Sequence, residues 1–175
     1  MNKTLAAAAA AVVMAPAGDA ATGLTSITRT GTVHLDSPPE HVFPLFTAPG
    51  ERLWVPGWDP QILTSGHGLE RGSVWLTGNG DDRTIWLVVD YDPESLHARY
   101  TRITPESRAG WVEVFARPDG EGGAEVEVTY QLTALNEHGV EVLAEFDEEN
   151  YAQMMAEWER LIREADIEYP VTFAD

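Results

Sequence analysis

Apolar and polar residues alternate with a period of two in two segments that lie far apart in the chain. Between residues 26 and 35, isoleucine, valine and leucine alternate with threonines and a histidine. Between residues 124 and 135, Val128, Tyr130 and Leu132 alternate with acidic, hydroxyl and amide side chains. A period of two is typical of a strand with one face in the core. We therefore expect both segments to be half-buried strands.

Four further runs of strand-like composition lie between these two segments, separated by turns rich in Gly, Asp and Pro. They span residues 73–77, 83–91, 95–103 and 110–117. Together with residues 124–135 they predict an antiparallel meander. The run 83–91 is apolar on both faces. One face is expected to line the interior, and the other either is covered by a second copy of the chain in a homodimer or stays an apolar surface.

Two short helices are expected between the first strand and this meander. Ser37 is placed to cap a helix over residues 39–46, which has prolines in its first turn. Residues 51–54 predict a second short turn before the break at Pro56 and Gly57. These segments are expected to form a lid at one end of the sheet.

A long amphipathic helix is expected near the end of the chain. Asn136 can cap a short helix through Phe146, and Asp147 can cap the long one. Apolar residues of the long helix recur at steps of three and four, namely Tyr151, Met154, Met155, Trp158, Leu161, Ile162 and Ala165. A sandwich would leave this stripe unburied. The order of elements therefore predicts an α+β helix-grip fold, in which a curved antiparallel sheet wraps around the C-terminal helix.

The composition limits the chemistry of the chain. Its 175 residues suffice for one domain with a core and an internal pocket. The sequence has 11 Lys and Arg against 29 Asp and Glu, a formal net charge of -18, so we expect no nucleic-acid partner. The one lysine is Lys3 and there is no cysteine. This excludes a Schiff-base lysine, a Walker lysine, thiol nucleophiles and disulfides.

The N-terminus has the pattern of a secretory signal peptide over residues 1–20. Lys3 precedes an apolar stretch from Leu5 to Met14, and small residues follow it. The stretch is too short to span a bilayer, so no membrane insertion of the mature chain is expected. We expect a periplasmic or secreted protein; if residues 1–20 are instead an Ala-rich arm, it is cytoplasmic. The domain is expected over residues 25–166, with residues 167–175 as a C-terminal tail.

Several stretches, taken in order, resemble one superfamily of ligand-binding folds. They are Pro38-Pro39-Glu40-His41-Val42-Phe43, Glu51-Arg52-Leu53-Trp54-Val55-Pro56-Gly57-Trp58, Thr84-Ile85-Trp86-Leu87-Val88-Val89-Asp90-Tyr91, Val128-Thr129-Tyr130-Gln131-Leu132-Thr133 and Tyr151 to Trp158. On these residues the chain resembles the SRPBCC (START-like, helix-grip) superfamily, and within it bacterial proteins of the polyketide cyclase/dehydrase and lipid-transport type. The resemblance covers about residues 25–166 and implies a cavity between sheet and C-terminal helix. It carries over no catalytic residues, because the superfamily includes enzymes, lipid carriers, hormone receptors and chaperone co-activators.

Aromatic side chains are the first candidates for lining this cavity, since rigid rings hold hydrophobic or aromatic molecules at low entropic cost. The sequence has 6 tryptophans. The predicted ligand-binding residues are Trp54, Trp58, Trp75, Trp86, Tyr100, Tyr130, Met154 and Trp158. For each tryptophan, ordinary core packing is the alternative.

Polar side chains inside the predicted sheet are the candidates for catalysis. They are Tyr100, Arg102 and Tyr130, which suit proton transfer in enolate chemistry. Glu113 is expected to face solvent, because its neighbours in the strand alternation are apolar. No cofactor or metal is expected. Glu51, Asp59 and His67 match no known ligand spacing, and a capping or loop-bracing role is favoured for them.

The sequence leaves three functions open. The first is a protein that binds a small hydrophobic or aromatic molecule between the sheet and the C-terminal helix. The second is a cyclase- or dehydratase-type enzyme that acts on a polyketide-like or aromatic substrate without a metal or nucleotide cofactor. The third is a protein-interaction module of the chaperone co-activator type, which would use the outer face of the sheet. The number of aromatic candidates favours the first.

Overall fold

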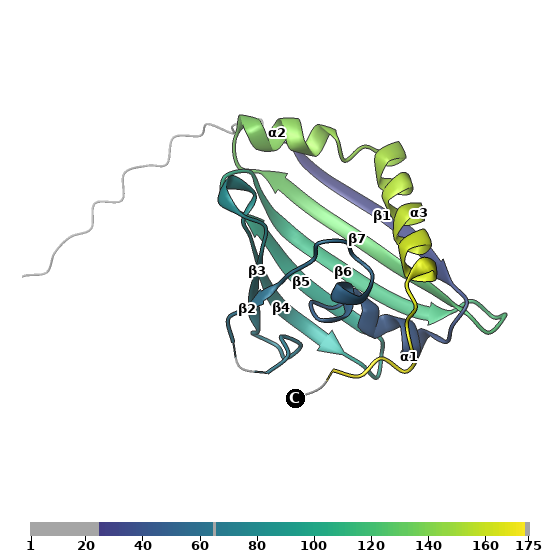
Figure 1. The fold of residues 1–175 in the computed structure, drawn as a ribbon. Helices are drawn as coiled ribbons and strands as arrows, with labels where there is room; N and C mark the ends of the chain where they lie inside the picture. The colour runs from purple at the N-terminus through teal and green to yellow at the C-terminus, as the bar shows by residue number, and fades with distance from the viewer. Residues whose placement is uncertain (1–24, 65, 174–175) are drawn as a thin grey trace, which may run out of the picture.

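A curved, seven-stranded antiparallel sheet carries one long helix over its β1 side in the computed structural model, which describes residues 25–64 and 66–173 (Figure 1). The strands are β1 (Ser26–Leu35), β2 (Gln61–Ile62), β3 (Val74–Thr77), β4 (Thr84–Asp92), β5 (His97–Thr104), β6 (Arg108–Pro118) and β7 (Ala124–Ala134). Their order in the sheet is β1-β7-β6-β5-β4-β3-β2. Strands β2 to β7 therefore form a meander, and β1 closes the far edge beside β7. The predicted helix-grip fold is confirmed.

The predicted strands agree with the observed ones, apart from small shifts at their ends. β1 begins and ends where the alternation predicts it. β2 is the exception, because the sequence pattern predicts no strand at residues 61–62. A two-residue strand has no periodicity of its own, and it forms because Gln61 and Ile62 pair with β3.

The short helices after β1 differ from the prediction in two respects. The helix α1 (Pro39–Val42) tightens into the 3-10 helix η1 (Phe43–Phe46), followed by η2 (Gly50–Leu53). Pro44 has no N–H to donate, and its ring crowds the preceding turn, which favours the tighter form. The predicted Ser37 cap is wrong: Pro38 is the cap residue, and the Ser37 side chain hydrogen-bonds Tyr169.

The two C-terminal helices begin at the predicted caps. In α2 (Glu137–Ala144), the side chain of Asn136 accepts the N–H three residues later, at 2.8 Å. In α3 (Glu148–Glu164), the side chain of Asp147 does the same at 2.7 Å. Among the described residues, no helix has the length and apolar character needed to cross a membrane.

Helix α3 packs closely on β1 because position 31 is a glycine. A Cβ atom at Gly31 would lie 2.6 Å from Cγ of Met155 and 3.0 Å from Cε1 of Tyr151. The Tyr151 hydroxyl donates a hydrogen bond to the backbone oxygen of Val128, at 2.9 Å. Tyr151 and Met155 are both buried. The helix is therefore held to the β1–β7 edge by direct packing and by one buried hydrogen bond.

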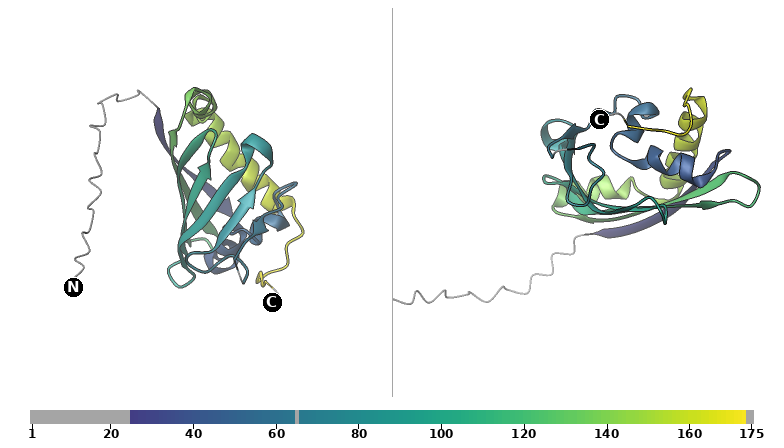
Figure 2. Two further views of the ribbon diagram at one scale, coloured as in Figure 1. Left: turned by 90° about the vertical axis from the view of Figure 1, so that its left-hand side faces the viewer. Right: turned by 90° about the horizontal axis from the view of Figure 1, so that it is seen from below.

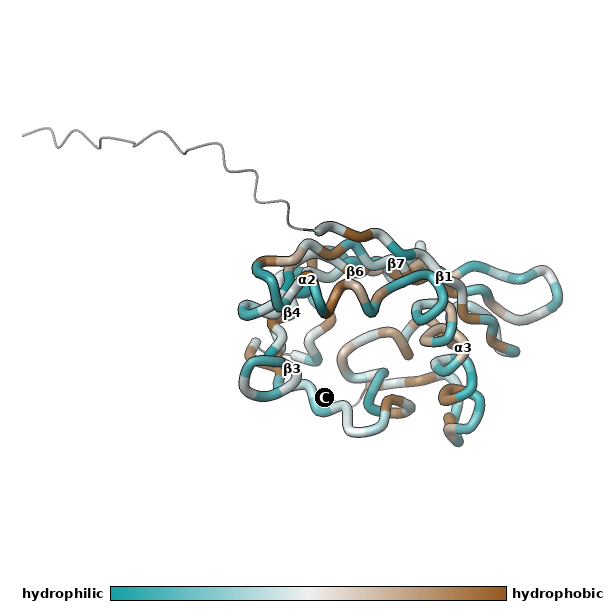
Figure 3. The backbone as a smooth tube through the Cα atoms, turned by 90° about the horizontal axis from the view of Figure 1, so that it is seen from above, coloured by the Kyte–Doolittle hydropathy of each residue, from teal (hydrophilic) through white to brown (hydrophobic). Residues whose placement is uncertain are grey.

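The core lies between the concave face of the sheet and the helices. Seen from below, the sheet curves beneath α1, the short helices and α3 (Figure 2). In β7 the inward residues are all buried; they are Ala124, Val126, Val128, Tyr130, Leu132 and Ala134. Hydrophobic and hydrophilic positions follow each other closely along the strands (Figure 3). The predicted inward face of β7 is confirmed, and Tyr130 lies on it.

The chain after α3 returns across the lid side of the domain. Ile167, Tyr169 and Val171 pack against the core, and the Tyr169 ring stacks on His41 with 5.8 Å between ring centroids. Residues up to 173 of the predicted C-terminal tail are thus partly packed. The predicted signal peptide, residues 1–20, lies outside the described residues.

Candidate functional site

A cavity of about 210 Å³, partly open to solvent, lies between the concave face of the sheet, the short helices and α3. Its walls come from β3–β7, from the lid segment of residues 46–58, from α3 and from the connection that precedes α3. The lining residues are Phe46, Thr47, Ala48, Glu51, Val55, Trp58, Trp75, Trp86, Tyr100, Arg102, Val112, Val114, Val128, Tyr130, Phe146, Met154 and Trp158. The cavity is therefore mostly apolar, with a few polar groups.

Stacked tryptophans form one wall of the cavity. Trp75 and Trp86 are paired across β3 and β4, and their rings are parallel within 4°, with centroids 5.9 Å apart. Trp58 meets the edge of Trp86 at 6.3 Å, and its Nε1 donates a hydrogen bond to the backbone oxygen of Ala48 at 2.9 Å. The Trp86 Nε1 donates to the Thr77 hydroxyl at 2.8 Å. These contacts fix the ring planes, so the wall is preformed.

Trp54 is the one predicted ligand-binding residue that does not line the cavity. It is buried behind the lid, where its Nε1 donates a hydrogen bond to the backbone oxygen of Leu45 at 2.8 Å. Its ring meets Trp158 at 5.5 Å and Phe46 at 6.0 Å between centroids. Trp54 therefore supports the two residues that do line the cavity. Ligand binding by Trp54 stays a prediction, and the structure places its ring behind the cavity wall because sequence pattern does not show which way a loop side chain turns.

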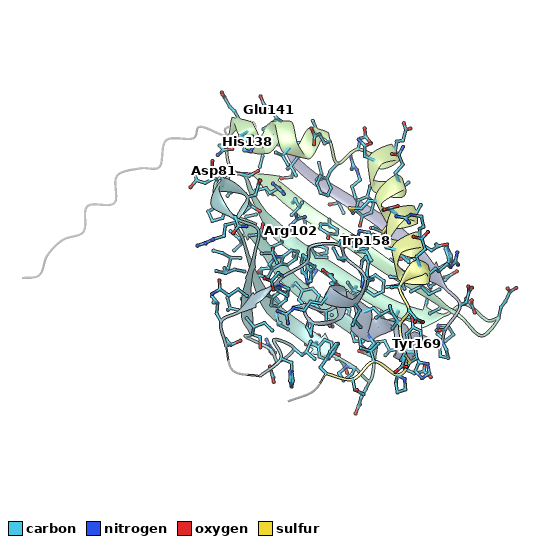
Figure 4. All side chains as sticks on the ribbon, viewed as in Figure 1. Asp81, Arg102, His138, Glu141, Trp158 and Tyr169 are labelled. Carbon is cyan, nitrogen blue, oxygen red and sulfur yellow. The ribbon has the colours of Figure 1, made fainter. Side chains whose placement is uncertain are left out.

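Helix α3 and the connection before it close the opposite side. Met154 and Trp158, which the sequence offers as ligand-binding candidates, line the cavity from one face of α3. Phe146, which precedes α3, lies 6.1 Å from the Tyr130 ring. Figure 4 shows Trp158 beside α3 and Arg102 over the concave face of the sheet.

The two predicted tyrosines lie in the cavity wall with different surroundings. The Tyr100 hydroxyl donates a hydrogen bond to the backbone oxygen of Phe46 at 3.2 Å, which ties the lid to β5. Burial raises the pKa of Tyr100 well above its ordinary value, and the pKa of Tyr130 to about 12. Both phenols are therefore neutral near pH 7. Tyr100 acts as a tether, whereas Tyr130 presents a hydroxyl that can donate to a ligand.

Glu51 is a polar residue of the cavity for which the sequence predicts a different role. It lies in η2, and its side chain lines the cavity rather than bracing the outer loop. Burial raises the pKa of Glu51 to about 8, and the charge of Arg102 partly opposes this shift. Asp59 is exposed and pairs with Arg52 at 3.6 Å, so these two acids do not form one site. The step between η1 and η2, which turns Glu51 inward, has no periodic signal in the sequence.

Arg102 faces Glu51 without contacting it. Its Cζ lies 5.4 Å from the centroids of both Trp86 and Tyr130, so the guanidinium rests against aromatic rings. Within residues 25–64 and 66–173, neither Arg102 nor the Glu51 carboxyl makes a hydrogen bond or an ion pair within 4 Å, and the Arg102 Nε is buried without a partner. A ligand group placed between them would meet a cation on one side and a carboxyl on the other.

The outer face of the sheet carries ion pairs and a half-buried apolar strip. Glu113 points outward, as predicted, and contacts Nε2 of His97 at 3.0 Å and Nε of Arg99 at 3.4 Å. Ile85 and Leu87 lie half-buried on the outer side of β4. A homodimer or a protein partner on this strip stays a prediction.

No metal centre is formed by the described part of the chain, since no three His, Asp or Glu residues there are grouped to hold an ion. The cavity residues themselves offer a different set of groups. They supply aromatic faces, one guanidinium, one carboxyl and two phenols. Such a set can bind an aromatic molecule and can donate or accept a proton at Glu51.

Solved structures with this fold include enzymes and uncharacterised proteins. Norcoclaurine synthase from Thalictrum flavum, in complex with dopamine and hydroxybenzaldehyde, superposes with a TM-score of 0.58 at 11% identity, over 95% of this chain and 100% of that chain. A putative uncharacterised protein from Rhizobium leguminosarum gives 0.57 at 16% identity, over 80% and 96%. Ara h 8.0201 gives 0.55 at 12% identity, over 79% and 99%. At these identities the likeness shows the fold.

Sequence comparison identifies the family. No curated protein matches the chain significantly. The family model described as polyketide cyclase / dehydrase and lipid transport matches residues 26–164, which spans every strand and α3. The chain therefore belongs to the polyketide cyclase/dehydrase and lipid-transport family of the SRPBCC superfamily.

Proposed function

We propose that this protein binds a small aromatic molecule in the cavity between the sheet and α3. The observation that carries the proposal is the set of aromatic rings that line the cavity from the lid, from the sheet and from α3. The rings that line it include Trp58, Trp75, Trp86, Tyr100, Tyr130 and Trp158. Apolar burial supplies roughly 25 cal/mol per Å² before the cost of association, and preformed walls reduce that cost.

The volume of the cavity supports a ligand of one or two rings. An apolar cavity of about 150 Å³ is large enough to bind benzene, and drug-sized ligands occupy about 300–1,000 Å³. The cavity here, at about 210 Å³, lies between these values. Long acyl chains and four-ring polyketides would require the lid or α3 to move. The complex of norcoclaurine synthase with dopamine and hydroxybenzaldehyde offers a precedent, since both are one-ring compounds.

Isothermal titration calorimetry with 2-naphthalenemethanol tests the proposal. We expect saturable 1:1 binding, and no comparable binding of palmitate. Met154→Trp places a larger ring in the cavity wall and should abolish binding. Gln153→Trp, one residue earlier on the exposed side of α3, is the matched control and should bind as wild type. Binding that is equally strong in Met154→Trp would mean that the probe sits elsewhere.

An enzyme of the cyclase or dehydratase type is the second candidate, and Glu51 is the observation that favours it. A carboxyl with a pKa of about 8 can give or take a proton near neutral pH. Arg102 faces it and could stabilise negative charge on a carbonyl oxygen. If a bound compound is converted, Tyr130→Phe and Glu51→Gln should lower the rate by about 10²- to 10⁴-fold while binding persists. If the protein only binds, Tyr130→Phe should change affinity by about 1 kcal/mol or less.

A further inference from the structure

A second, polar hollow of about 620 Å³ adjoins the aromatic cavity. It shares Trp58 and Arg102 with that cavity, so the two spaces meet at these side chains. Its walls come from the loop after η2, from the β3–β4 hairpin and from the start of β6. Its lining residues are Gly57, Trp58, Asp59, Gln61, Leu76, Thr77, Gly78, Asn79, Asp82, Arg83, Thr84, Arg102 and Arg108. We call this space the vestibule.

Two arginines of the vestibule lie side by side on the concave face of the sheet. Arg102 of β5 pairs with Gly110 of β6, and Arg108 is two residues before Gly110 on the same face. They are therefore diagonal neighbours across the strand pair. Burial, and then the charge of Arg102, lower the pKa of Arg108. The Nε atoms of both arginines are buried and make no hydrogen bond within the described residues.

The protein provides little counter-charge for this pair. Asp59 is paired with Arg52 instead. Asp82 favours the charged form of Arg108, but forms no ion pair with it within 4 Å. Glu51 faces Arg102 and is mostly protonated at pH 7, because its pKa is about 8. In the described structure, neither arginine of the pair has a carboxylate within ion-pair distance, although the chain carries 29 Asp and Glu.

We propose that Arg102 and Arg108 bind the carboxylate of an aromatic acid whose rings enter the cavity beside Trp75 and Trp86. The inference rests on the proposed function and names its ligand class. A planar guanidinium can donate two parallel hydrogen bonds to one carboxylate, and such charge-assisted bonds are the strong ones. An anion also relieves the repulsion between two neighbouring cations. The ligand is therefore an arene carboxylate rather than a neutral arene.

Glu51 makes this binding dependent on pH. The groups that face its carboxyl are Arg102 on β5, with the phenols of Tyr100 and Tyr130, and both phenols stay neutral in the relevant range. Below pH 8 the neutral carboxyl can donate a hydrogen bond to the bound carboxylate. Above pH 8 it is itself an anion, which repels the ligand and competes for Arg102. Affinity for the aromatic acid should fall as pH rises through about 8.

The experiment compares 2-naphthoate with 2-naphthalenemethanol, which has the same rings and no charge. By calorimetry at pH 6, the wild type should bind 2-naphthoate about ten- to a hundredfold more tightly, the range for charge-assisted hydrogen bonds. Arg102→Gln and Arg108→Gln should each remove most of this preference. Arg117→Gln, on the outer face, is the matched control and should keep it. Raising the pH to 9 should reduce the preference in wild type, but not in Glu51→Gln.

The other possible outcomes contradict either the anion site or the proposed function. Equal binding of the two compounds by wild type would refute the anion site alone, since the neutral compound would still occupy the cavity. A preference that survives in both arginine variants would place the carboxylate elsewhere. Failure of both compounds to bind would refute the proposed function, and the anion site with it. The Arg102 side chain makes no hydrogen bond in the described structure, so its variant is expected to fold, which circular dichroism checks.

Discussion

Replacing Glu51 with glutamine tests how deeply the carboxyl is enclosed in the cavity. Burial raises its pKa from 4.5 to about 8. Between these pH values the folded protein binds a proton that the unfolded chain releases, so the free energy of unfolding falls as pH rises. The contribution of Glu51 to the free energy of unfolding is complete below pH 4.5 and is lost as pH rises through about 8. Glutamine has the shape of the protonated form and carries no charge at any pH, so Glu51→Gln should remove this loss.

The magnitude follows from the same two pKa values. One unit corresponds to about 1.4 kcal/mol, so a dry carboxyl would cost about 5 kcal/mol above pH 8. The Glu51 side chain is only partly exposed, so solvent relieves little of this cost. At pH 9, Glu51→Gln should therefore be more stable than wild type by about 3–5 kcal/mol. At pH 5 the two proteins should be equal.

Urea unfolding at pH 5 and pH 9, followed by tryptophan fluorescence, measures this difference. Glu121→Gln, on an exposed residue of the β6–β7 loop, serves as the control and should track wild type at both pH values. If the difference between Glu51→Gln and wild type is the same at pH 5 and pH 9, the carboxyl is solvated. The pH dependence that we predict for ligand binding would then lose its basis.

Three further outcomes are expected elsewhere in the chain. Gly31→Val should lower the free energy of unfolding in urea by about 1–3 kcal/mol, because the new side chain meets α3. Thr28→Val, on the outer face of the same strand, is the control and should lower it by less than about 0.5 kcal/mol. Tyr151→Phe should cost about 1–2 kcal/mol by the same assay, because it removes the buried hydrogen bond to the backbone of β7. Export predicts a mature N-terminus at Gly18 or Ala21, and an intact mass beginning at Met1 from an exporting host would contradict it.

The features that the sequence predicted correctly are those that repeat along the chain or depend on nearby residues. The alternation in residues 124–134 places Tyr130 inward, because successive strand residues point to opposite faces. The caps at Asn136 and Asp147 each satisfy a backbone N–H only three residues away. The spacing in α3 likewise predicts that Met154 and Trp158 share the face that lines the cavity. These signals need no knowledge of the rest of the molecule.

Tertiary structure alone decided the polar part of the site. Trp54 and Glu51 lie in an irregular segment whose sequence has no period. Only the packing of this segment against β5 and α3 shows that the Trp54 ring turns away from the cavity and that the Glu51 carboxyl turns into it. The pairing of β5 with β6 brings Arg102 beside Arg108, which sequence spacing does not reveal. Periodicity reports the face on which a residue lies, whereas the neighbours across a cavity, and hence its charge balance, are set by how distant segments pack.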